Sequence, residues 1–148
     1  MTVERASDAA TSAGSSALSV GDVIAERTVH LTRESLVRYA GASGDFNPIH
    51  YRDDVAAQVG LPGVLAHGML TMGLAVSTVE SWLGDSGRIL EYGVRFTRPV
   101  VVDAESGADV GIVAAVGAVD EGTARIDLTV THAGTTVLGK AQVRVRRD

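Results

Sequence analysis

The chain contains no cysteine, and this absence narrows the chemistry that it can perform. Without thiols its 148 residues can form no disulfide, no cysteine-based zinc site and no thiol nucleophile. Such a composition is compatible with a reducing compartment. Long hydrophobic runs are also missing, since no stretch approaches the roughly 18 apolar residues that a membrane span requires. We therefore expect no transmembrane segment.

The first residues lack the features of a targeting signal. They read M-T-V-E-R-A-S-D and never build an apolar core of about 7 to 15 residues behind a basic start. Residues 1–19 are rich in Ala, Ser, Thr and Gly and carry almost no large apolar side chain, which predicts a disordered tail. Together with the missing membrane span, these features predict a cytoplasmic protein.

Positive charge is in deficit. The 13 Lys and Arg residues face 18 Asp and Glu residues, so the formal net charge is −5. Nucleic acid is therefore not expected as the main partner, because the phosphate backbone favours basic protein faces. With 45% hydrophobic residues the chain is long enough for one compact domain, which we expect over residues 20–148.

The first half of the chain shows helical periodicity. Thr32 is a suitable N-cap for a helix that reaches Ala42. The expected apolar stripe of this helix consists of Leu36, Val37 and Ala40. A longer helix is predicted over residues 68–83, where apolar residues cover most of the circumference, as is typical of a core helix. The other elements expected here are a strand over residues 23–31 and a short helix over residues 53–59.

The second half changes to a period of two residues. Strands are expected over residues 88–97, 108–119, 123–131 and 136–146. The third alternates cleanly, which predicts a sheet with one buried and one solvated face. One long apolar helix and about five strands are typical of an α+β fold, in which a curved antiparallel sheet wraps around a central helix.

A polar cluster follows the first expected helix. Asp45, Asn47 and His50 fall within six residues, around the loop-forming Gly44 and Pro48. Pro48 disfavours a helical conformation for the residue before it, so the segment should be a loop. Loops held on a rigid scaffold commonly present reactive side chains. A carboxylate and an imidazole this close together are suitable for acid–base chemistry.

A second signal opens the long apolar helix at His67 and Gly68. A backbone N–H in the first turn of a helix has no acceptor within the helix and lies at the positive end of its dipole. The Gly68 N–H is therefore a candidate donor to a developing oxyanion. With Asp45 and His50, it points to proton transfer beside a carbonyl group. No cofactor and no metal ion are expected.

Structural explanations remain open for several of these residues. Asp45 and Asn47 could be turn formers that bond their own backbone, and Asn47 is expected to brace the loop. His67 is expected to be structural, also in support of the loop. His30 and His132 have no acidic or histidine partner at ligand spacing. A zinc site would need three or four ligands, and the chain offers neither Cys nor H-x-x-x-H.

Three strings in the chain resemble a known family. S-G-D-F-N-P-I-H, A-H-G-M-L-T-M-G and E-Y-G-V-R-F-T-R-P-V look like the MaoC-type R-specific hydratase/dehydratase family, which has the hot-dog fold. Within it, the chain is most similar to the beta subunits of mycobacterial-type (3R)-hydroxyacyl-ACP dehydratases. The likeness extends from Leu18 to Arg146 and implies a single hot-dog domain.

The resemblance also implies an activity. A dehydratase of this kind removes water from a (3R)-3-hydroxyacyl thioester and yields a trans-2-enoyl thioester, with Asp45 and His50 as the acid–base pair. One alternative is an R-specific enoyl-CoA hydratase, and another is a non-catalytic acyl-binding hot-dog subunit. The thioester handle, an acyl carrier protein (ACP) or coenzyme A (CoA), stays open, as does the proton that each residue handles.

Two expectations concern partners. A five-stranded sheet on one helix leaves an edge open, so we expect a homodimer or a heterodimer with a second hot-dog chain. Lys140, Arg144 and Arg146 fall on one strand face by period two. This basic strip is either a receiver for a CoA phosphate or an acidic carrier protein, or a solvated outer face.

Overall fold

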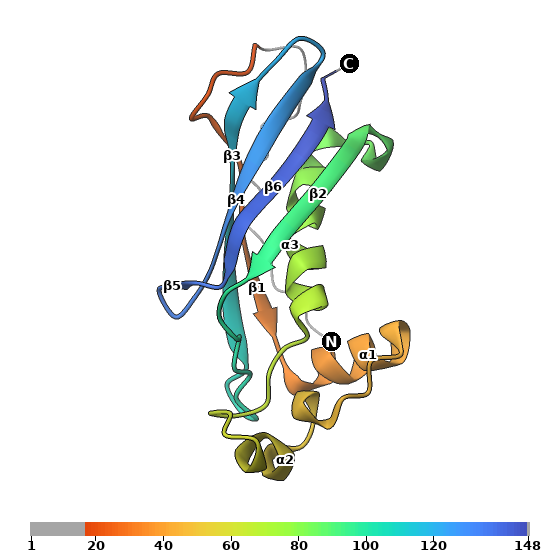
Figure 1. Cartoon of the computed structure of the whole chain (residues 1–148), viewed down its shortest axis with the longest axis vertical. Helices are drawn as coiled ribbons and strands as arrows, with labels where there is room; N and C mark the ends of the chain where they lie inside the picture. The colour runs from red at the N-terminus through yellow and green to blue at the C-terminus, as the bar shows by residue number, and fades with distance from the viewer. Residues whose placement is uncertain (1–16, 148) are drawn as a thin grey trace.

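A computed structural model describes residues 17–147, in which one antiparallel sheet packs against a long helix (Figure 1). The strand order is β1-β3-β4-β6-β2, and the short β5 pairs with β4. The strands are β1 (Val23–Leu31), β2 (Ile89–Phe96), β3 (Ala108–Val119), β4 (Thr123–His132), β5 (Thr135–Thr136) and β6 (Leu138–Arg146). The helices are α1 (Arg33–Ser43), α2 (Asp53–Gln58) and α3 (Gly68–Leu83), with single 3₁₀ turns η1 (Pro48–His50) and η2 (Ser86–Arg88). The expected α+β class with a central helix is confirmed.

The strand pattern follows the alternation in the sequence. In β4 the side chains of Ala124, Ile126 and Val130 are fully buried, as their period of two predicts. The five long strands are confirmed. The last expected strand, residues 136–146, was wrong at its start: Thr135 and Thr136 pair with β4 as β5, and β6 begins at Leu138.

Helix α3 lies along the sheet and has the predicted bounds (Figure 1). Ala75, Val79 and Trp82 are buried in the core cluster that α3 shares with the sheet. The edge strand β2 is tied to α3 because the Tyr92 hydroxyl donates to the Met72 carbonyl at 2.7 Å. Burial raises the pKa of Tyr92 to about 12, so this donor keeps its proton at physiological pH.

The prediction that α3 is covered on nearly all sides is wrong for its first turns. Met69 is 59% exposed, and Met72 and Val76 are only partly buried. The sheet covers one side of the helix, and the described residues do not cover the side on which Met69 lies. An uncovered apolar side chain at this place is a feature that a partner chain would bury.

Helices α1 and α2 with η1 form an overhang, residues 33–58, at one end of the sheet (Figure 1). Thr32 is the N-cap of α1, as predicted, and accepts from the Ser35 N–H. Leu36 and Ala40 are buried, but Val37 is 60% exposed, so the predicted three-residue stripe is too wide by one residue. Successive positions 36 and 37 are about 100° apart on a helix, and only one of them faces the protein.

Arg33 joins the overhang to the body of the domain. Its Nε donates to the Val102 carbonyl at 2.7 Å, and its terminal nitrogens donate to both carboxylate oxygens of Asp53, at 2.8 and 3.1 Å. One planar guanidinium therefore binds the first residue of α2 and the segment after β2. It fixes the overhang where the overhang joins the sheet.

His30 is an exposed residue of strand β1 that has an acidic partner on the neighbouring strand. Its Nδ1 lies 2.6 Å from Asp109 Oδ1, and the two residues are register partners in β1 and β3. Local spacing could not reveal this partner, because the pairing joins positions 79 residues apart.

Two further expectations concern the N-terminal tail and a membrane span. Of the expected tail over residues 1–19, residues 1–16 lie outside the described residues, whereas Leu18 packs against the core. Within residues 17–147, no helix has both the length and the apolar character needed to cross a bilayer.

Candidate active site

The segment from Gly44 to His50 folds on its own side chains. Gly44 adopts a left-handed conformation with φ of 77° and ends α1. The Asn47 N–H donates to Asp45 Oδ1 at 3.1 Å, and the Ile49 N–H donates to Asn47 Oδ1 at 3.2 Å. Both residues are thus turn formers, and the expected loop contains one 3₁₀ turn that Asn47 caps. The second carboxylate oxygen of Asp45 stays available for chemistry.

His50 is held with one nitrogen facing the Asp45 carboxylate. Its Nδ1 lies 2.7 Å from the Leu65 carbonyl oxygen, which can only accept, so in the neutral ring Nδ1 carries the proton. The lone pair is then on Nε2, which lies 3.8 Å from Asp45 Oδ2. The ring is buried, whereas about half of the Asp45 side chain is exposed. A basic nitrogen and a carboxylate oxygen thus lie close enough together for one substrate hydroxyl beside them to reach both.

The Leu65 carbonyl is itself fixed from two sides. The Leu65 N–H donates to the Ile49 carbonyl at 3.1 Å, and the Ala66 N–H donates to the Val100 carbonyl at 2.9 Å. The bridge between Leu65 and Val101 adds an antiparallel contact. This segment therefore sets the orientation of the imidazole through backbone atoms.

His67 lies behind the pair. Its ring stacks on His50 with centroids 3.8 Å apart and an interplanar angle of 21°, and Tyr39 meets it edge-on at 4.8 Å. Its Nε2 donates to the backbone carbonyl of Asp45 at 3.1 Å. Among the described residues its buried Nδ1 has no hydrogen-bond partner. Burial lowers the pKa of His67, and a charge on His50 acts in the same direction, so the ring stays neutral.

Gly68 is the first residue of α3, and His67 is its N-cap. Among the described residues, no backbone carbonyl accepts from the Gly68 N–H, whereas the N–H groups of Leu70 and Thr71 both bond the His67 carbonyl. A Cβ at Gly68 would lie 2.9 Å from Cε1 of Phe96. The glycine therefore allows the Phe96 ring to pack against the start of the helix.

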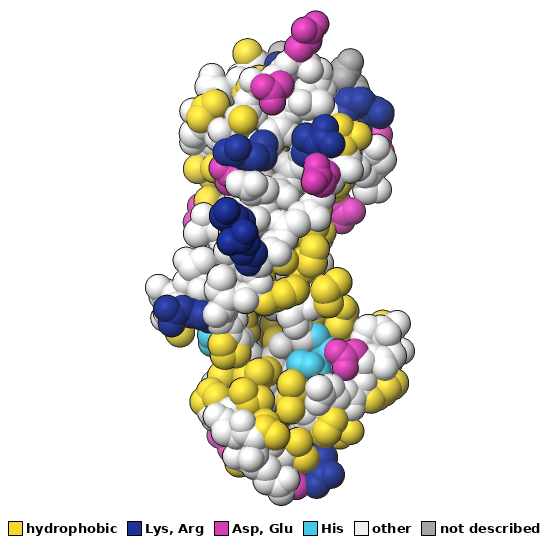
Figure 2. Space-filling view, in the orientation of Figure 1, with side chains coloured by type: hydrophobic (Ala, Val, Ile, Leu, Met, Phe, Trp, Pro, Cys, Tyr) yellow, Lys and Arg dark blue, Asp and Glu magenta, His cyan; other side chains and the backbone are white. Residues whose placement is uncertain are grey.

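A cavity of about 340 Å³ opens at this point. It is lined by His50 and Gly68 and by the residues that follow β2. The other lining residues are Leu65, Ala66, Thr71, Phe96, Thr97, Arg98, Pro99, Val100, Val137 and Leu138. Figure 2 shows cyan histidine side chains beside a magenta carboxylate, with yellow apolar side chains above and below. A mostly apolar cavity that ends on an imidazole is suitable for an acyl chain.

The three polar side chains also form a possible metal-ligand group. Ligand atoms of Asp45, His50 and His67 lie within 4.8 Å of one another. The imidazole lone pairs lie in the ring planes, and the two rings stack almost parallel, so a single ion cannot lie in both planes. The arrangement is therefore better suited to proton transfer than to metal binding.

The structure brings together the residues that the sequence singled out. His50 and Gly68 line the cavity, whereas Asp45 and His67 reach it only through His50. Asp45 faces the Nε2 of His50, and the ring of His67 stacks on it. Two neighbours were not foreseen: the Leu65 carbonyl, which has no side-chain signature, and Arg98, which lines the cavity. Arg98 lies in the third resembling string, next to the proline near its end, and that position was its available signal.

Comparison with known proteins identifies the family of the chain. The MaoC like domain family matches residues 18–137. The chain belongs to the MaoC-like domain family. The resemblance that the three strings carry is therefore confirmed, and the MaoC-like chain has the hot-dog fold of its structural neighbours.

The relatives of the MaoC-like chain differ in how much of their own length it covers. It is 38% identical over 79 residues to the 3-hydroxyacyl-thioester dehydratase X of Mycobacterium tuberculosis, which is 53% of this chain and 27% of that protein. It spans about a quarter of this relative. A solved MaoC-like dehydratase is 38% identical with a TM-score of 0.85, over 91% of this chain and 42% of that one. An unliganded R-hydratase from Pseudomonas aeruginosa is 30% identical with a TM-score of 0.73, over 88% and 84%.

Proposed function

We propose that the chain is a (3R)-3-hydroxyacyl-thioester dehydratase. The observation that carries the proposal is the position of His50, whose Nδ1 is held by a carbonyl while its free Nε2 faces Asp45 Oδ2 at 3.8 Å. Histidine is the most common general acid or base in enzymes, so a fixed imidazole with a free nitrogen is suited to accept and return a proton. The names of the relatives, a 3-hydroxyacyl-thioester dehydratase and an R-hydratase, support the same chemistry.

The reaction needs two proton movements. His50 Nε2 removes the proton from C2 of the substrate, next to the thioester carbonyl. The electron pair of that C–H bond forms the C2=C3 double bond as the C3–O bond breaks. The imidazolium then gives its proton to the departing hydroxyl, which leaves as water. Asp45 Oδ2 accepts a hydrogen bond from the 3-hydroxyl and stabilises the imidazolium.

The charge on the thioester oxygen needs a donor in the transition state. The Gly68 N–H is free among the described residues and lies at the positive end of α3. Removal of one such donor costs about 10²- to 10³-fold in kcat in well-studied enzymes. Gly68 lines the same cavity as His50, which allows one thioester to reach both.

His67 and Asn47 are positioning residues in this proposal. The N–H of His67 holds the backbone of Asp45, and its neutral ring supports His50 from behind. Asn47 caps the turn that carries His50. Neither side chain touches the reacting atoms, so each acts through the residue that it holds.

Hydration of a trans-2-enoyl-CoA is the same reaction in reverse, and the Pseudomonas aeruginosa R-hydratase supports that direction. The same residues serve both directions by microscopic reversibility. A non-catalytic acyl-binding subunit would have no need of the exposed carboxylate next to a fixed imidazole. The site therefore favours an enzyme that needs no cofactor.

The active species in this proposal is a dimer of hot-dog chains, either two copies or this chain with a different one. β2 is an edge of the sheet, and exposed apolar side chains lie along it and around the site. They are Phe46 (61%), Met69 (59%), Leu90 (44%) and Phe96 (56%). A second chain on this face would bury them and enclose Asp45.

One assay tests the function directly. Crotonyl-CoA is added to the purified chain, and the loss of the enoyl-thioester absorbance is followed. Longer enoyl-CoA and carrier-protein substrates, and then (3R)-hydroxyacyl thioesters, are assayed in the same way. Formation of the (3R) product supports the proposal. Acyl-thioester binding without turnover, with or without a second hot-dog chain, would show a binding subunit instead.

A further inference from the structure

Arg98 is a cation in an otherwise uncharged wall. It lines the cavity of about 340 Å³ together with His50 and Gly68, and among the described lining residues there is no Asp or Glu. Its backbone N–H donates to the Val137 carbonyl at 3.4 Å, and Val137 also lines the cavity. The backbone of Arg98 is therefore held in place by another residue of the cavity wall.

In the part of the chain that the structure describes, the guanidinium of Arg98 has no anion to bind. Within residues 17–147, no ion pair and no side-chain hydrogen bond involves it, and the residue is exposed. A guanidinium carries five N–H donors and stays charged at physiological pH. The apolar walls suit a hydrocarbon chain, but a free guanidinium suits an anionic group of the ligand.

We propose that Arg98 binds the phosphate of the phosphopantetheine arm. This inference rests on the proposed function, which puts the thioester carbonyl at Gly68 and His50. The phosphate is the anion nearest the thioester in both CoA and a charged carrier protein, so the same contact serves either handle. Guanidinium groups match phosphate oxygens in geometry and charge. In a chain with a net charge of −5, a local cation also offsets the repulsion of an anionic substrate.

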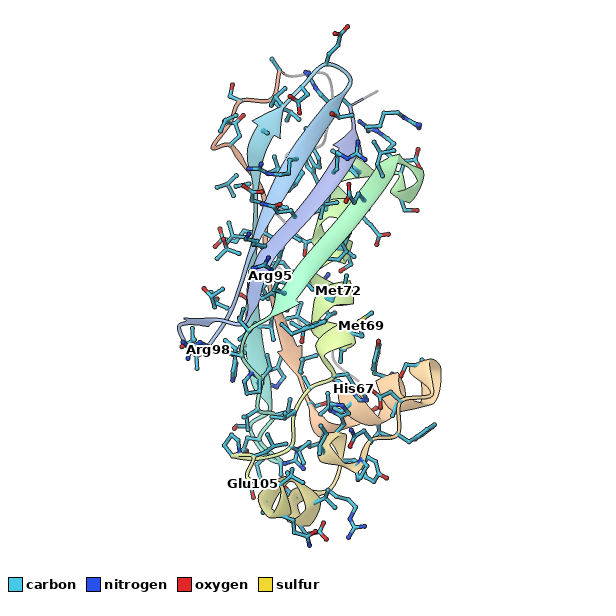
Figure 3. All side chains as sticks on the ribbon, in the orientation of Figure 1. His67, Met69, Met72, Arg95, Arg98 and Glu105 are labelled. Atoms are coloured by element: carbon cyan, nitrogen blue, oxygen red, sulfur yellow. The ribbon has the colours of Figure 1, made fainter. Side chains whose placement is uncertain are left out.

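Two other arginines show how Arg98 differs from the other positive charges on this surface. Arg95, three residues earlier in β2, is likewise exposed, and within the described chain its side chain has no ion pair or hydrogen bond. It does not line the cavity. Figure 3 shows Arg95 on β2 and Arg98 after the end of the strand. Arg144 of the basic strip lies 3.4 Å from Glu91 Oε2, so its charge already has a partner.

The test compares Arg98→Gln with the matched variant Arg95→Gln. For each, kcat/KM is measured with crotonyl-CoA, crotonyl carrier protein and crotonyl-pantetheine, which lacks the phosphate. We expect Arg98→Gln to lose about 10- to 100-fold with the first two and less than about 2-fold with the third. Arg95→Gln should change all three by less than about 2-fold.

Three outcomes would overturn the proposal: an equal loss with crotonyl-pantetheine, an equal loss in Arg95→Gln, or a loss with only one of the two phosphate-bearing handles. Calorimetric binding of phosphopantetheine and pantetheine to the wild type and both variants keeps the test independent of turnover. If the wild type turns over no thioester, the proposed function fails. The subsite fails if Arg98→Gln binds phosphopantetheine as tightly as the wild type does.

Discussion

The imidazole rings of His50 and His67 stack with centroids 3.8 Å apart and an interplanar angle of 21°. Two positive charges at that distance would repel each other strongly in a partly buried site. Burial already lowers the pKa of His67, and its neutral ring therefore leaves His50 free to take up a proton. In the proposed mechanism, His67 therefore supports the base and does not compete with it for the proton.

The first prediction concerns stability and pH. Because the pKa of His67 is lower in the folded chain, the unfolded chain binds this proton more readily. Above pH 6.5, the ordinary pKa of histidine, His67 does not change the free energy of unfolding. As the pH drops below 6.5, the free energy of unfolding falls, and the fall levels off below the lowered pKa of the folded chain. His67→Gln keeps a side-chain N–H for the Asp45 carbonyl and cannot titrate. Urea unfolding at about pH 8 and pH 5 should show a larger loss in the wild type than in His67→Gln. Equal losses would contradict the assignment.

The second prediction concerns the acid–base pair. Asp45→Asn and His50→Gln should each lower kcat by at least about 10². The His50 variant loses the group that moves the protons, and the Asp45 variant loses the charge that stabilises the imidazolium. In Asp45→Asn the side-chain amide oxygen can still accept from the Asn47 N–H, so the turn should remain. Circular dichroism and the unfolding midpoint serve as the controls for folding. Near-normal turnover in Asp45→Asn would leave Asp45 with the role of turn former alone.

The third prediction isolates the Gly68 N–H. Proline is well tolerated at the first position of a helix, and the extended backbone of His67, with φ of −59° and ψ of 129°, fits a residue before proline. Gly68→Pro therefore removes the proposed donor and preserves the helix. Gly68→Ala is the matched control, since its Cβ meets Phe96 in the same way and its N–H remains. We expect kcat of Gly68→Pro to lie about 10²- to 10³-fold below that of Gly68→Ala. Similar rates in the two variants would rule out the oxyanion role.

The fourth prediction concerns the dimer. Met69 is 59% exposed in the first turn of α3, where an acidic side chain is compatible with the helix dipole. Light scattering of the wild type, alone or with a second hot-dog chain, should report a dimer. Met69→Asp should report a species of 15.3 kDa with reduced activity. Val59→Asp, at a residue that is 61% exposed at the end of α2, is the control and should stay dimeric. A fully active wild-type monomer would refute the prediction.

The sequence predicted those parts of the fold that depend on local pattern. Helix α3 has the predicted bounds because its apolar run starts at a glycine and ends at Gly84, which adopts φ of 71°. Strand β5 was missed because two threonines are too short for a period to show. The pairing of His30 with Asp109 was missed because it depends on the register of β1 and β3.

The same division holds for the candidate site. Asp45, His50 and Gly68 could be predicted because their residue types and positions carry chemistry. The acceptor for His50 is a backbone carbonyl, which every residue has, so only the fold selects Leu65. Stacking of His67 on His50 is likewise a product of how α3 meets the overhang.

The backbone hydrogen bonds that hold residues 64–66 on both sides have a consequence for protein engineering. The Leu65 N–H bonds Ile49 and the Val102 N–H bonds Val64, so the backbone beside His50 is fixed after the chain has already turned at residues 60–63. Gly60 begins that turn with φ of 79°, and no side chain from residues 60–63 lines the cavity within the described chain. Loops of this kind accept insertions when the hydrogen bonds of their flanks are kept. A short peptide tag placed after Pro62 keeps the bond of the Leu61 N–H to the Ala56 carbonyl and should therefore not displace the reactive atoms.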